Sequence, residues 1–339
     1  MLKFEEKFSL KNYNTFGIDV KADLFVRINN ENELSELENI NYANTNNILI
    51  LGGGSNILFT SDYEGLVIYM DIKGMRISKV SKDYIILSVS AGEKWSDFVN
   101  ICLKNKYYGL ENLAMIPGKV GAAPVQNIGA YGVEQKDFFL KLKAYDLKET
   151  SFKEFDSDSC QFAYRSSFFK ENKDNSFVIT EVSYRLSKIP IINLSYKELK
   201  QEIEKIPTIE PDSQYLYDVV CRLRSRKLPD PDLIGNAGSF FKNPIIQIDQ
   251  LNLLLKDYPE IKYYPYTNTS VKVSAGWLIE KCGFKGKRIG DAGVYDKHAL
   301  ILINYGNASG KDILDLANQI EREVQAKFNI KLEKEVKIY

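Results

Sequence analysis

Two glycine-rich and almost uncharged segments constrain the fold of this chain more than any other feature. The first, LGGGSN at residues 51–56, follows a β-rich run and leads into ILFT, which predicts another strand. A dinucleotide-binding turn of the Rossmann type would lead instead into a helix, whose N-terminus holds the pyrophosphate. Alone, this segment is typical of a tight hairpin.

The second segment, PGKVGAAPVQNIGAYG at residues 117–132, is far too long for a turn. Glycines let backbone N–H groups approach an anion closely, so two such loops can hold a pyrophosphate between them. Neither loop contains the GK[ST] of an ATP-binding P-loop. The pair therefore indicates a nucleotide cofactor held mainly by backbone donors.

The composition restricts the partners of the chain. Its 339 residues favour more than one domain, and 45 basic residues balance 45 acidic ones. No net field attracts nucleic acid or an anionic membrane. The N-terminal MLKFEEKFSL lacks the apolar core of a signal peptide, and no apolar run reaches the roughly 18 residues of a membrane span. We expect a cytoplasmic protein that binds neither nucleic acid nor membrane.

Cysteine and histidine usage weakens the hydrolase and metalloenzyme hypotheses. The four cysteines are far apart in sequence, without the close spacing of a zinc site or a redox pair. The single histidine, His298, excludes a multi-histidine metal site, and a Ser-His-Asp triad would have to use it. We expect no metal.

Short β-rich runs dominate the first half, which favours an α+β fold. Helical spacing predicts one helix over 95–105, with Phe98, Ile101 and Cys102 on one face, and another over 214–227. A third helix is capped by Ser309. Its apolar stripe consists of Ile313, Leu316, Ile320, Val324 and Phe328. A proline-bounded linker precedes residue 212, and a domain boundary is expected within 227–244.

The last segment, IKLEKEVKI at 330–338, alternates strictly, so its apolar residues face one way and Glu333 and Glu335 the other. A second notable stretch is GNAGSFFKNP at 235–244, in which Ser239 stands between small residues and two phenylalanines. From the residues alone, Ser239 could be a nucleophile, a phosphate ligand, a proton donor or a turn residue.

Seven segments, in this order, resemble the UDP-N-acetylenolpyruvoylglucosamine reductase (MurB) family of flavoenzymes. They are NTFGIDVKA (14–22), ILGGGSNIL (50–58), IPGKVGAAPVQNIGAYG (116–132), FAYRSSFFK (162–170), KLPDPDLIGNAGSFFKNP (227–244), SAGWLIEKCGFKG (274–286) and LEKEV (332–336). LSYKEL and the long segment 245–305 resemble the form of the family with a substrate-covering tyrosine loop.

The resemblance implies an FAD-binding domain of the vanillyl-alcohol-oxidase (PCMH) type over 17–188. This domain has two subdomains, about 1–65 and 66–215, of which the first is completed by a C-terminal strand at 330–339. A smaller α+β substrate domain is expected over 229–329. In that family NADPH reduces FAD, and enolpyruvyl-UDP-N-acetylglucosamine then takes the hydride to become UDP-N-acetylmuramate. We expect noncovalent FAD and a monomer.

The resemblance also assigns catalytic roles. Ser239 matches the proton donor, and a hydroxyl can protonate a strongly basic carbanionic carbon where water is excluded. Arg165 matches the arginine that pairs with the substrate carboxylate, because a guanidinium fork suits two oxygens. Glu335 matches the glutamate near the reacting carbon; periodicity does not distinguish it from Glu333. The alternatives without a catalytic role are a turn serine for Ser239, a surface arginine for Arg165 and a solvated charge at a strand edge for both glutamates.

The remaining contacts follow from the same resemblance. Those expected to bind substrate are Tyr131, Tyr196, Arg224, Lys227, Asn243, Tyr264, Lys285 and His298. Those expected to bind FAD are Gly52, Gly53, Gly54, Ser55, Asn56, Ile116, Pro117, Gly118, Gly121, Ala122, Asn127, Gly129 and Ala130. Ala122 and Ala123 replace serines common in the family, which removes hydroxyl contacts, and His298 replaces a common glutamine. Two other hypotheses stay open: an FAD oxidase of the same superfamily and a sugar-nucleotide-binding protein without chemistry.

Overall fold

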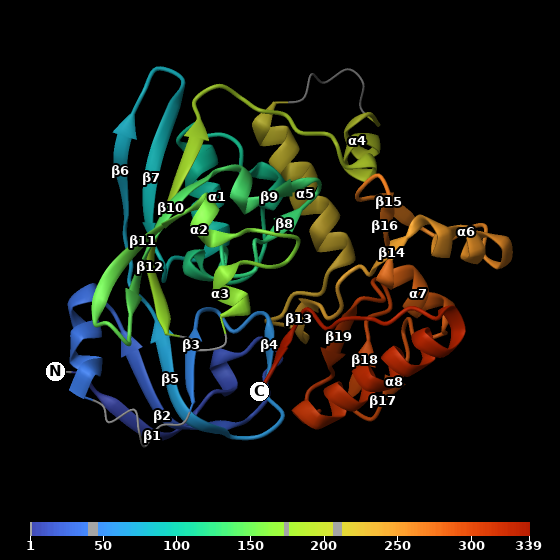
Figure 1. Cartoon of the computed structure of the whole chain (residues 1–339), viewed down its shortest axis with the longest axis horizontal. Coiled ribbons are helices and arrows are strands. Elements are labelled where there is room, and N and C mark those ends of the chain that lie inside the picture. Colours follow the sequence, from blue (N-terminus) through green and yellow to red (C-terminus); the bar gives the residue numbers. More distant parts are fainter. Residues whose placement is uncertain (1, 40–46, 173–175, 206–211) are drawn as a thin grey trace. The chain divides into compact units, whose positions relative to one another are not determined.

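The computed structural model describes residues 2–39, 47–172, 176–205 and 212–339 (Figure 1). The chain forms two compact units. Unit 1 comprises Met1–Phe8, Ala22–Gly53 and Glu64–Arg226, and unit 2 comprises Ser9–Lys21, Gly54–Tyr63 and Lys227–Tyr339. The predicted linker falls mostly on 206–211, outside the described residues.

Unit 1 is built around two larger sheets and one small hairpin. The first sheet has the order β1-β2-β5-β3, with β3 parallel to β5. Its strands are β1 (Phe4–Ser9), β2 (Lys21–Ile28), β5 (Tyr63–Met70) and β3 (Ile48–Leu51). The second sheet is antiparallel and has the order β11 (Ser151–Asp156), β10 (Phe139–Asp146), β12 (Phe177–Ser187), β7 (Tyr84–Ser90) and β6 (Met75–Val80). The hairpin pairs β8 (Gly129–Ala130) with β9 (Val133–Glu134).

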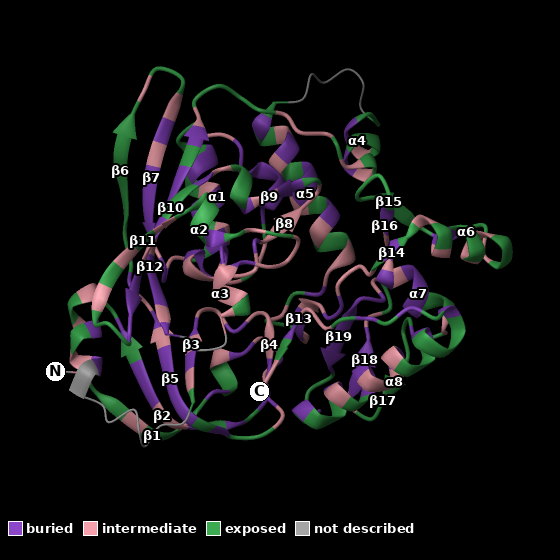
Figure 2. Ribbon diagram, viewed as in Figure 1, coloured by how far each residue is buried: buried purple, intermediate pink, exposed green. Residues whose placement is uncertain are grey.

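One face of the antiparallel sheet carries the main core of unit 1. Leu87 of β7, Leu142 of β10 and Val182 of β12 are buried in it, and Figure 2 shows the contrast between these strands and the exposed edge strand β6. Two helices, α1 (Trp95–Lys104) and α5 (Ser213–Lys227), contribute to this core. Shorter helices complete the unit: α2 (Ser157–Cys160), α3 (Phe168–Glu171), α4 (Lys197–Ile203) and the 3-10 helices η2 (Glu31–Asn39), η4 (Glu111–Leu113), η5 (Val120–Ala122) and η6 (Gln135–Asp137).

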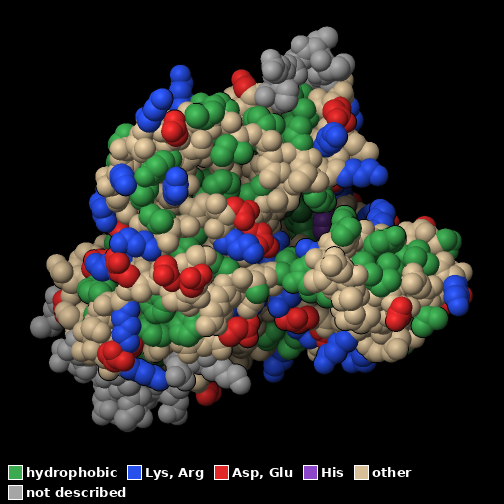
Figure 3. Space-filling model, turned by 45° about the horizontal axis from the view of Figure 1, so that its top comes forward, with side chains coloured by type: hydrophobic (Ala, Val, Ile, Leu, Met, Phe, Trp, Pro, Cys, Tyr) green, Lys and Arg blue, Asp and Glu red, His purple; other side chains and the backbone are tan. Residues whose placement is uncertain are grey.

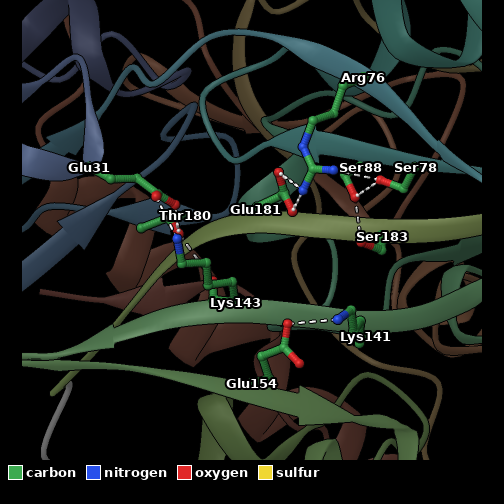
Figure 4. Close-up of polar contacts among 10 residues, drawn as sticks. All are labelled: Glu31, Arg76, Ser78, Ser88, Lys141, Lys143, Glu154, Thr180, Glu181 and Ser183. Carbon is green, nitrogen blue, oxygen red and sulfur yellow. Dashed lines mark hydrogen bonds and ion pairs between the residues drawn. The ribbon is translucent and has the colours of Figure 1, made fainter.

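The opposite face of the antiparallel sheet forms an open groove with a volume of about 900 Å³. Most of its charges pair with one another: Arg76 binds Glu181 through two bonds, and Lys143 binds Glu31 at 2.6 Å. The hydroxyls of Ser78, Ser88 and Ser183 link three strands in a row (Figure 4). Three basic side chains of the groove, Arg76, Lys141 and Lys143, are thus each paired with one of its carboxylates.

Unit 2 contains two sheets and a strand pair. The first sheet has the order β13 (Gly235–Ser239), β19 (Ile301–Asn304), β18 (Ala292–Val294) and β17 (Arg288–Ile289). The second has the order β14 (Ile245–Gln247), β16 (Ser270–Val273) and β15 (Tyr263–Pro265), and β20 (Lys337–Ile338) lies parallel to β4 (Ile57–Leu58). The helices are η1 (Lys11–Tyr13), α6 (Ile248–Asp257), α7 (Ala275–Lys281) and α8 (Gly310–Phe328). Helix α8 packs on β18, β19 and α7.

The predicted helices are present, but one residue that was predicted to lie on a buried face is exposed. The whole predicted stripe of α8 is buried, and Ser309 accepts the amide of Asp312 in a capping box. In α1, Phe98 and Cys102 are buried as predicted, but Ile101 is 41% exposed. Ile101 is three positions from Phe98 and lies on the edge of the apolar stripe, whose centre is completed by Val99 and Trp95.

Charge is distributed as the balanced composition predicts. On the face drawn in Figure 3, basic and acidic side chains are interspersed rather than gathered by sign. Within the described ranges, no helix combines the length and apolarity that crossing a membrane requires.

Candidate active site

The two glycine loops meet inside unit 1. A Cβ atom on Gly53 would lie 2.9 Å from the Cα of Gly118, closer than packed carbon atoms allow. A Cβ on Gly121 would lie 2.5 Å from the Cβ of Ala91. The glycines therefore permit an approach of two backbones that side chains would prevent. Two glycine backbones in close contact are the kind of loop pair that suits a pyrophosphate, which is part of FAD.

The first loop continues into unit 2, where it is packed just as tightly. A Cβ on Gly54 would lie 2.0 Å from the carbonyl oxygen of Tyr13, and the φ of Gly54 is +63°. The Thr15 amide donates to the Gly54 carbonyl at 3.1 Å. The remaining predicted FAD contacts lie in the same two loops: Gly52, Ser55, Asn56, Ile116, Pro117, Ala122, Asn127, Gly129 and Ala130.

Asn127 fixes the second loop from within. Its side chain is fully buried, and its amide donates to the Glu134 carboxylate at 2.9 Å and to the Ala163 carbonyl at 3.1 Å. The Ser167 hydroxyl donates to the Val125 carbonyl at 2.6 Å. The loop is thus bonded to the segment that carries the predicted catalytic arginine.

Arg165 occupies a tight turn closed by hydrogen bonds between Ala163 and Ser166. Its φ is 55°, a left-handed conformation that costs an arginine about 1 kcal/mol or more. Its guanidinium donates to the Gly129 carbonyl at 2.6 Å, so it lies directly against the second glycine loop. A strained residue held in place in this way is typical of functional sites.

Three predicted substrate residues also come together in unit 1. The rings of Tyr131 and Tyr196 meet edge to face with centroids 5.4 Å apart. Burial raises the pKa of Tyr131, and the nearby positive charge of Arg224 opposes part of this rise. Burial lowers the pKa of Arg224, and within the described residues its buried Nε makes no hydrogen bond. This buried donor leaves one hydrogen bond that an anionic ligand can accept.

In unit 2, the backbone around Ser239 is held by its neighbours. Gly238 has a φ of +68°, and the Asn236 side chain accepts its amide at 3.0 Å. The Thr15 hydroxyl donates to the Asn236 carbonyl at 2.6 Å. Ser239 is half-buried and, in the part of the chain that the structure describes, its hydroxyl makes no hydrogen bond. That hydroxyl is therefore available to a ligand.

The C-terminal segment brings Glu335 to Ser239. The Glu335 amide donates at 2.8 Å to the carbonyl of Phe240, the residue after Ser239. Asn56 of the first glycine loop donates at 3.0 Å to the Glu335 carbonyl. Glu333, by contrast, is exposed and ion-paired with Lys242. The backbone of Glu333 pairs with the same segment, since its carbonyl accepts the Lys242 amide at 2.9 Å. The two glutamates differ in exposure: Glu333 is exposed and Glu335 is half-buried.

The other predicted substrate residues of unit 2 have contacts or positions of their own. Asn243 accepts the amide of Ala275 at the start of α7 at 3.0 Å. Tyr264 is 42% exposed in β15, and Lys285 pairs with Glu280 at 3.2 Å. His298 accepts the Leu300 amide at 3.3 Å, and Lys227 ends α5. Arg165, Tyr131, Tyr196 and Arg224 belong to unit 1, and the residues just named, with Ser239 and Glu335, belong to unit 2.

Comparison with known proteins identifies the chain. Residues 22–151 match a family model for an FAD binding domain, and residues 230–339 match the C-terminal domain of UDP-N-acetylenolpyruvoylglucosamine reductase. A protein of that name from Flavobacterium johnsoniae is 45% identical over 99% of this chain and 100% of its own length. One from Pseudomonas aeruginosa is 42% identical over 100% of this chain and 99% of its own. The crystal structure of the reductase from Thermus caldophilus aligns with a TM-score of 0.69 at 24% identity, covering 100% of this chain and 99% of that one.

These matches define an FAD-binding protein of the α+β class with a separate C-terminal domain. The chain belongs to the UDP-N-acetylenolpyruvoylglucosamine reductase family. The predicted resemblance, fold class and FAD cofactor are confirmed. The predicted domain limits stay a prediction.

Proposed function

We propose that this chain reduces enolpyruvyl-UDP-N-acetylglucosamine to UDP-N-acetylmuramate with NADPH, a step of peptidoglycan precursor synthesis. The observation that carries the proposal is the close approach of Gly53 and Gly118, which forms a cofactor cradle in a chain of this family. When bound, FAD supplies the hydride chemistry that couples NADPH to the substrate. The backbones of the two glycine loops would hold it.

The residues of unit 1 are assigned to anion binding. Hydride addition to the terminal carbon of the enolpyruvyl group spreads negative charge into the carboxylate. Arg165 would bind that carboxylate, since its fork matches two oxygens and its position is fixed by Gly129. Arg224, with its orphaned Nε, would bind the diphosphate or sugar beside Tyr131 and Tyr196.

The residues of unit 2 are assigned to proton transfer. Ser239 would protonate the carbon next to the carboxylate, and its unengaged hydroxyl supports this role. Glu335, bonded to the residue after Ser239, would lie near the same carbon. Lys227, Asn243, Tyr264, Lys285 and His298 would contact the UDP-sugar and nicotinamide. We further propose a cytoplasmic monomer with noncovalent FAD; the described cysteines lie outside both glycine loops.

The test uses the purified protein without oxygen. We expect a yellow protein whose flavin is bleached by NADPH and regains its colour when enolpyruvyl-UDP-N-acetylglucosamine is added. Mass spectrometry should show product heavier than substrate by two hydrogens. A colourless protein, or a flavin that NADPH leaves oxidised, would contradict the proposal. An oxidase would instead be bleached by a sugar or alcohol and recoloured by air.

A further inference from the structure

Lys119 lies in the second glycine loop, but its side chain is buried rather than exposed to solvent. It is only 6% exposed. Its ammonium donates at 2.5 Å to the Met70 carbonyl and at 3.1 Å to the Asp71 carboxylate, and it lies 3.7 Å from the centroid of the Tyr69 ring. A buried lysine is costly unless it is paired, so three partners on one short segment indicate a specific tether.

This tether reaches both glycine loops. Tyr69 is the register partner of Leu51 in the parallel pair β3–β5, and Leu51 is the residue that opens the first loop. The Cβ of Lys119 would meet a Cβ on Gly52 at 3.7 Å. Lys119 therefore joins the second loop to the strand next to the first loop, at the point where that loop begins.

Several charged and titratable groups surround Lys119 and act on its pKa. Burial lowers the pKa of Lys119 to about 8, against the hydrogen bond with Asp71, which raises it. Burial alone would raise the pKa of Asp71, but hydrogen bonds from Lys119 and Lys73 outweigh it and lower that pKa. Burial raises the pKa of Tyr69. The other charged groups that act on this cluster are Arg27, Lys73 and Lys94.

We propose that Lys119 is a positioning residue for FAD, whose buried ammonium holds the two glycine loops at the spacing that the cofactor requires. The inference rests on the function proposed above. A loop already held in its binding geometry loses less conformational freedom when the ligand binds, so the tether strengthens FAD binding. By linkage, the FAD-bound protein then holds the Lys119 proton more tightly than the FAD-free protein.

The proposal predicts how the affinity for FAD depends on pH. Below about pH 8 the ammonium is charged and the tether is intact. Above that pH the free protein loses this proton, while Asp71 stays ionised and Tyr69 stays neutral, so FAD must also restore the proton in order to bind. FAD affinity should therefore fall as pH rises through about 8, by up to roughly tenfold for each further pH unit.

Fluorescence titration of FAD into flavin-free protein tests the proposal. Lys119→Met should weaken binding about tenfold or more at pH 7, and Lys119→Arg, which can still pair with Asp71, should recover most of the affinity. The control is Lys94→Met, because Lys94 is exposed and its backbone bridges that of Lys119. It should bind FAD like wild type.

A pH series separates positioning from a general loss of stability. The dissociation constant of wild type should rise above about pH 8, whereas that of Lys119→Met should not follow this rise. Equal affinity of wild type and Lys119→Met, or parallel pH profiles, would overturn the inference; the wild-type profile tests it even if the variant does not fold. If wild type binds no FAD at any pH, the proposed function fails as well. If wild type and Lys119→Met both bind FAD tightly, only the inference about Lys119 fails.

Discussion

Replacing Gly53 by alanine tests whether the two glycine loops must touch for FAD to bind. The new Cβ would lie 2.9 Å from the Cα and 3.4 Å from the carbonyl carbon of Gly118. Carbon atoms pack at about 3.5–4.0 Å, so one loop must move by about 0.6–1.1 Å. The obstacle is backbone rather than the end of a flexible side chain, so it cannot simply rotate away.

The cost of such overpacking is typically about 1–3 kcal/mol. In the FAD-free protein the loops can separate and relieve part of it, so the melting temperature should fall little. When FAD is bound, the loops must close and the full cost applies. We therefore expect Gly53→Ala to raise the dissociation constant of FAD about 5- to 150-fold.

The matched control is Gly52→Ala, one residue earlier. Its Cβ would meet the Cβ atoms of Ala122 at 3.4 Å and of Lys119 at 3.7 Å, which are close to ordinary contacts. Flavin content after purification and fluorescence titration would measure FAD binding, and thermal melting of the FAD-free proteins would measure folding. If Gly53→Ala bound FAD as tightly as wild type, the cradle would be refuted, since the loops could then separate without loss.

Three further changes test the assigned catalytic residues. Ser239→Ala should leave flavin reduction by NADPH nearly unchanged but slow reoxidation by enolpyruvyl-UDP-N-acetylglucosamine about 10²–10⁴-fold in stopped-flow absorbance; equal slowing of both half-reactions would make Ser239 a structural residue. Arg165→Lys keeps the charge but loses the fork, and should lower turnover about 10- to 150-fold, the equivalent of ~1.5–3 kcal/mol; near wild-type turnover would remove Arg165 from the carboxylate site. Glu335→Gln should slow reoxidation, whereas Glu333→Gln should not, because Glu333 is exposed and paired with Lys242; the reverse order would reassign the role.

Features set by local periodicity could be predicted from the sequence. The apolar stripe of α8 is buried as predicted, and so are Ile330, Leu332 and Val336 of the alternating segment 330–338. Its last apolar residue, Ile338, is only half-buried, and only Lys337–Ile338 form a strand there. Ile101 was misplaced because an i, i+3 pair at the edge of a stripe satisfies the same pattern as one at its centre. Periodicity also could not distinguish Glu335 from Glu333. Both backbones pair with the distant segment 240–242, and the two residues differ in that Glu333 is exposed and ion-paired with Lys242 whereas Glu335 is half-buried.

Lys119 shows why the rest could not be predicted. In the sequence it is one lysine in a glycine-rich loop, where an exposed charge is the ordinary expectation. Its burial depends on Tyr69, Met70 and Asp71, which reach it only because β5 ends beneath the second loop. No local pattern carries that information.

The backbone in and around the second loop limits prediction for a different reason. Met115, Asn127, Tyr131 and Arg165 all have φ between 45° and 55°, where local preference would place glycine. Each costs about 1 kcal/mol or more, so such residues persist only where the surroundings fix them. The surroundings here do so: Asn112 donates to the Tyr131 carbonyl at 3.0 Å, and the Asn127 side chain bonds on both sides. These positions carry side chains where glycine would be easier, so local residue preference could not predict the backbone conformation beside the proposed cofactor cradle.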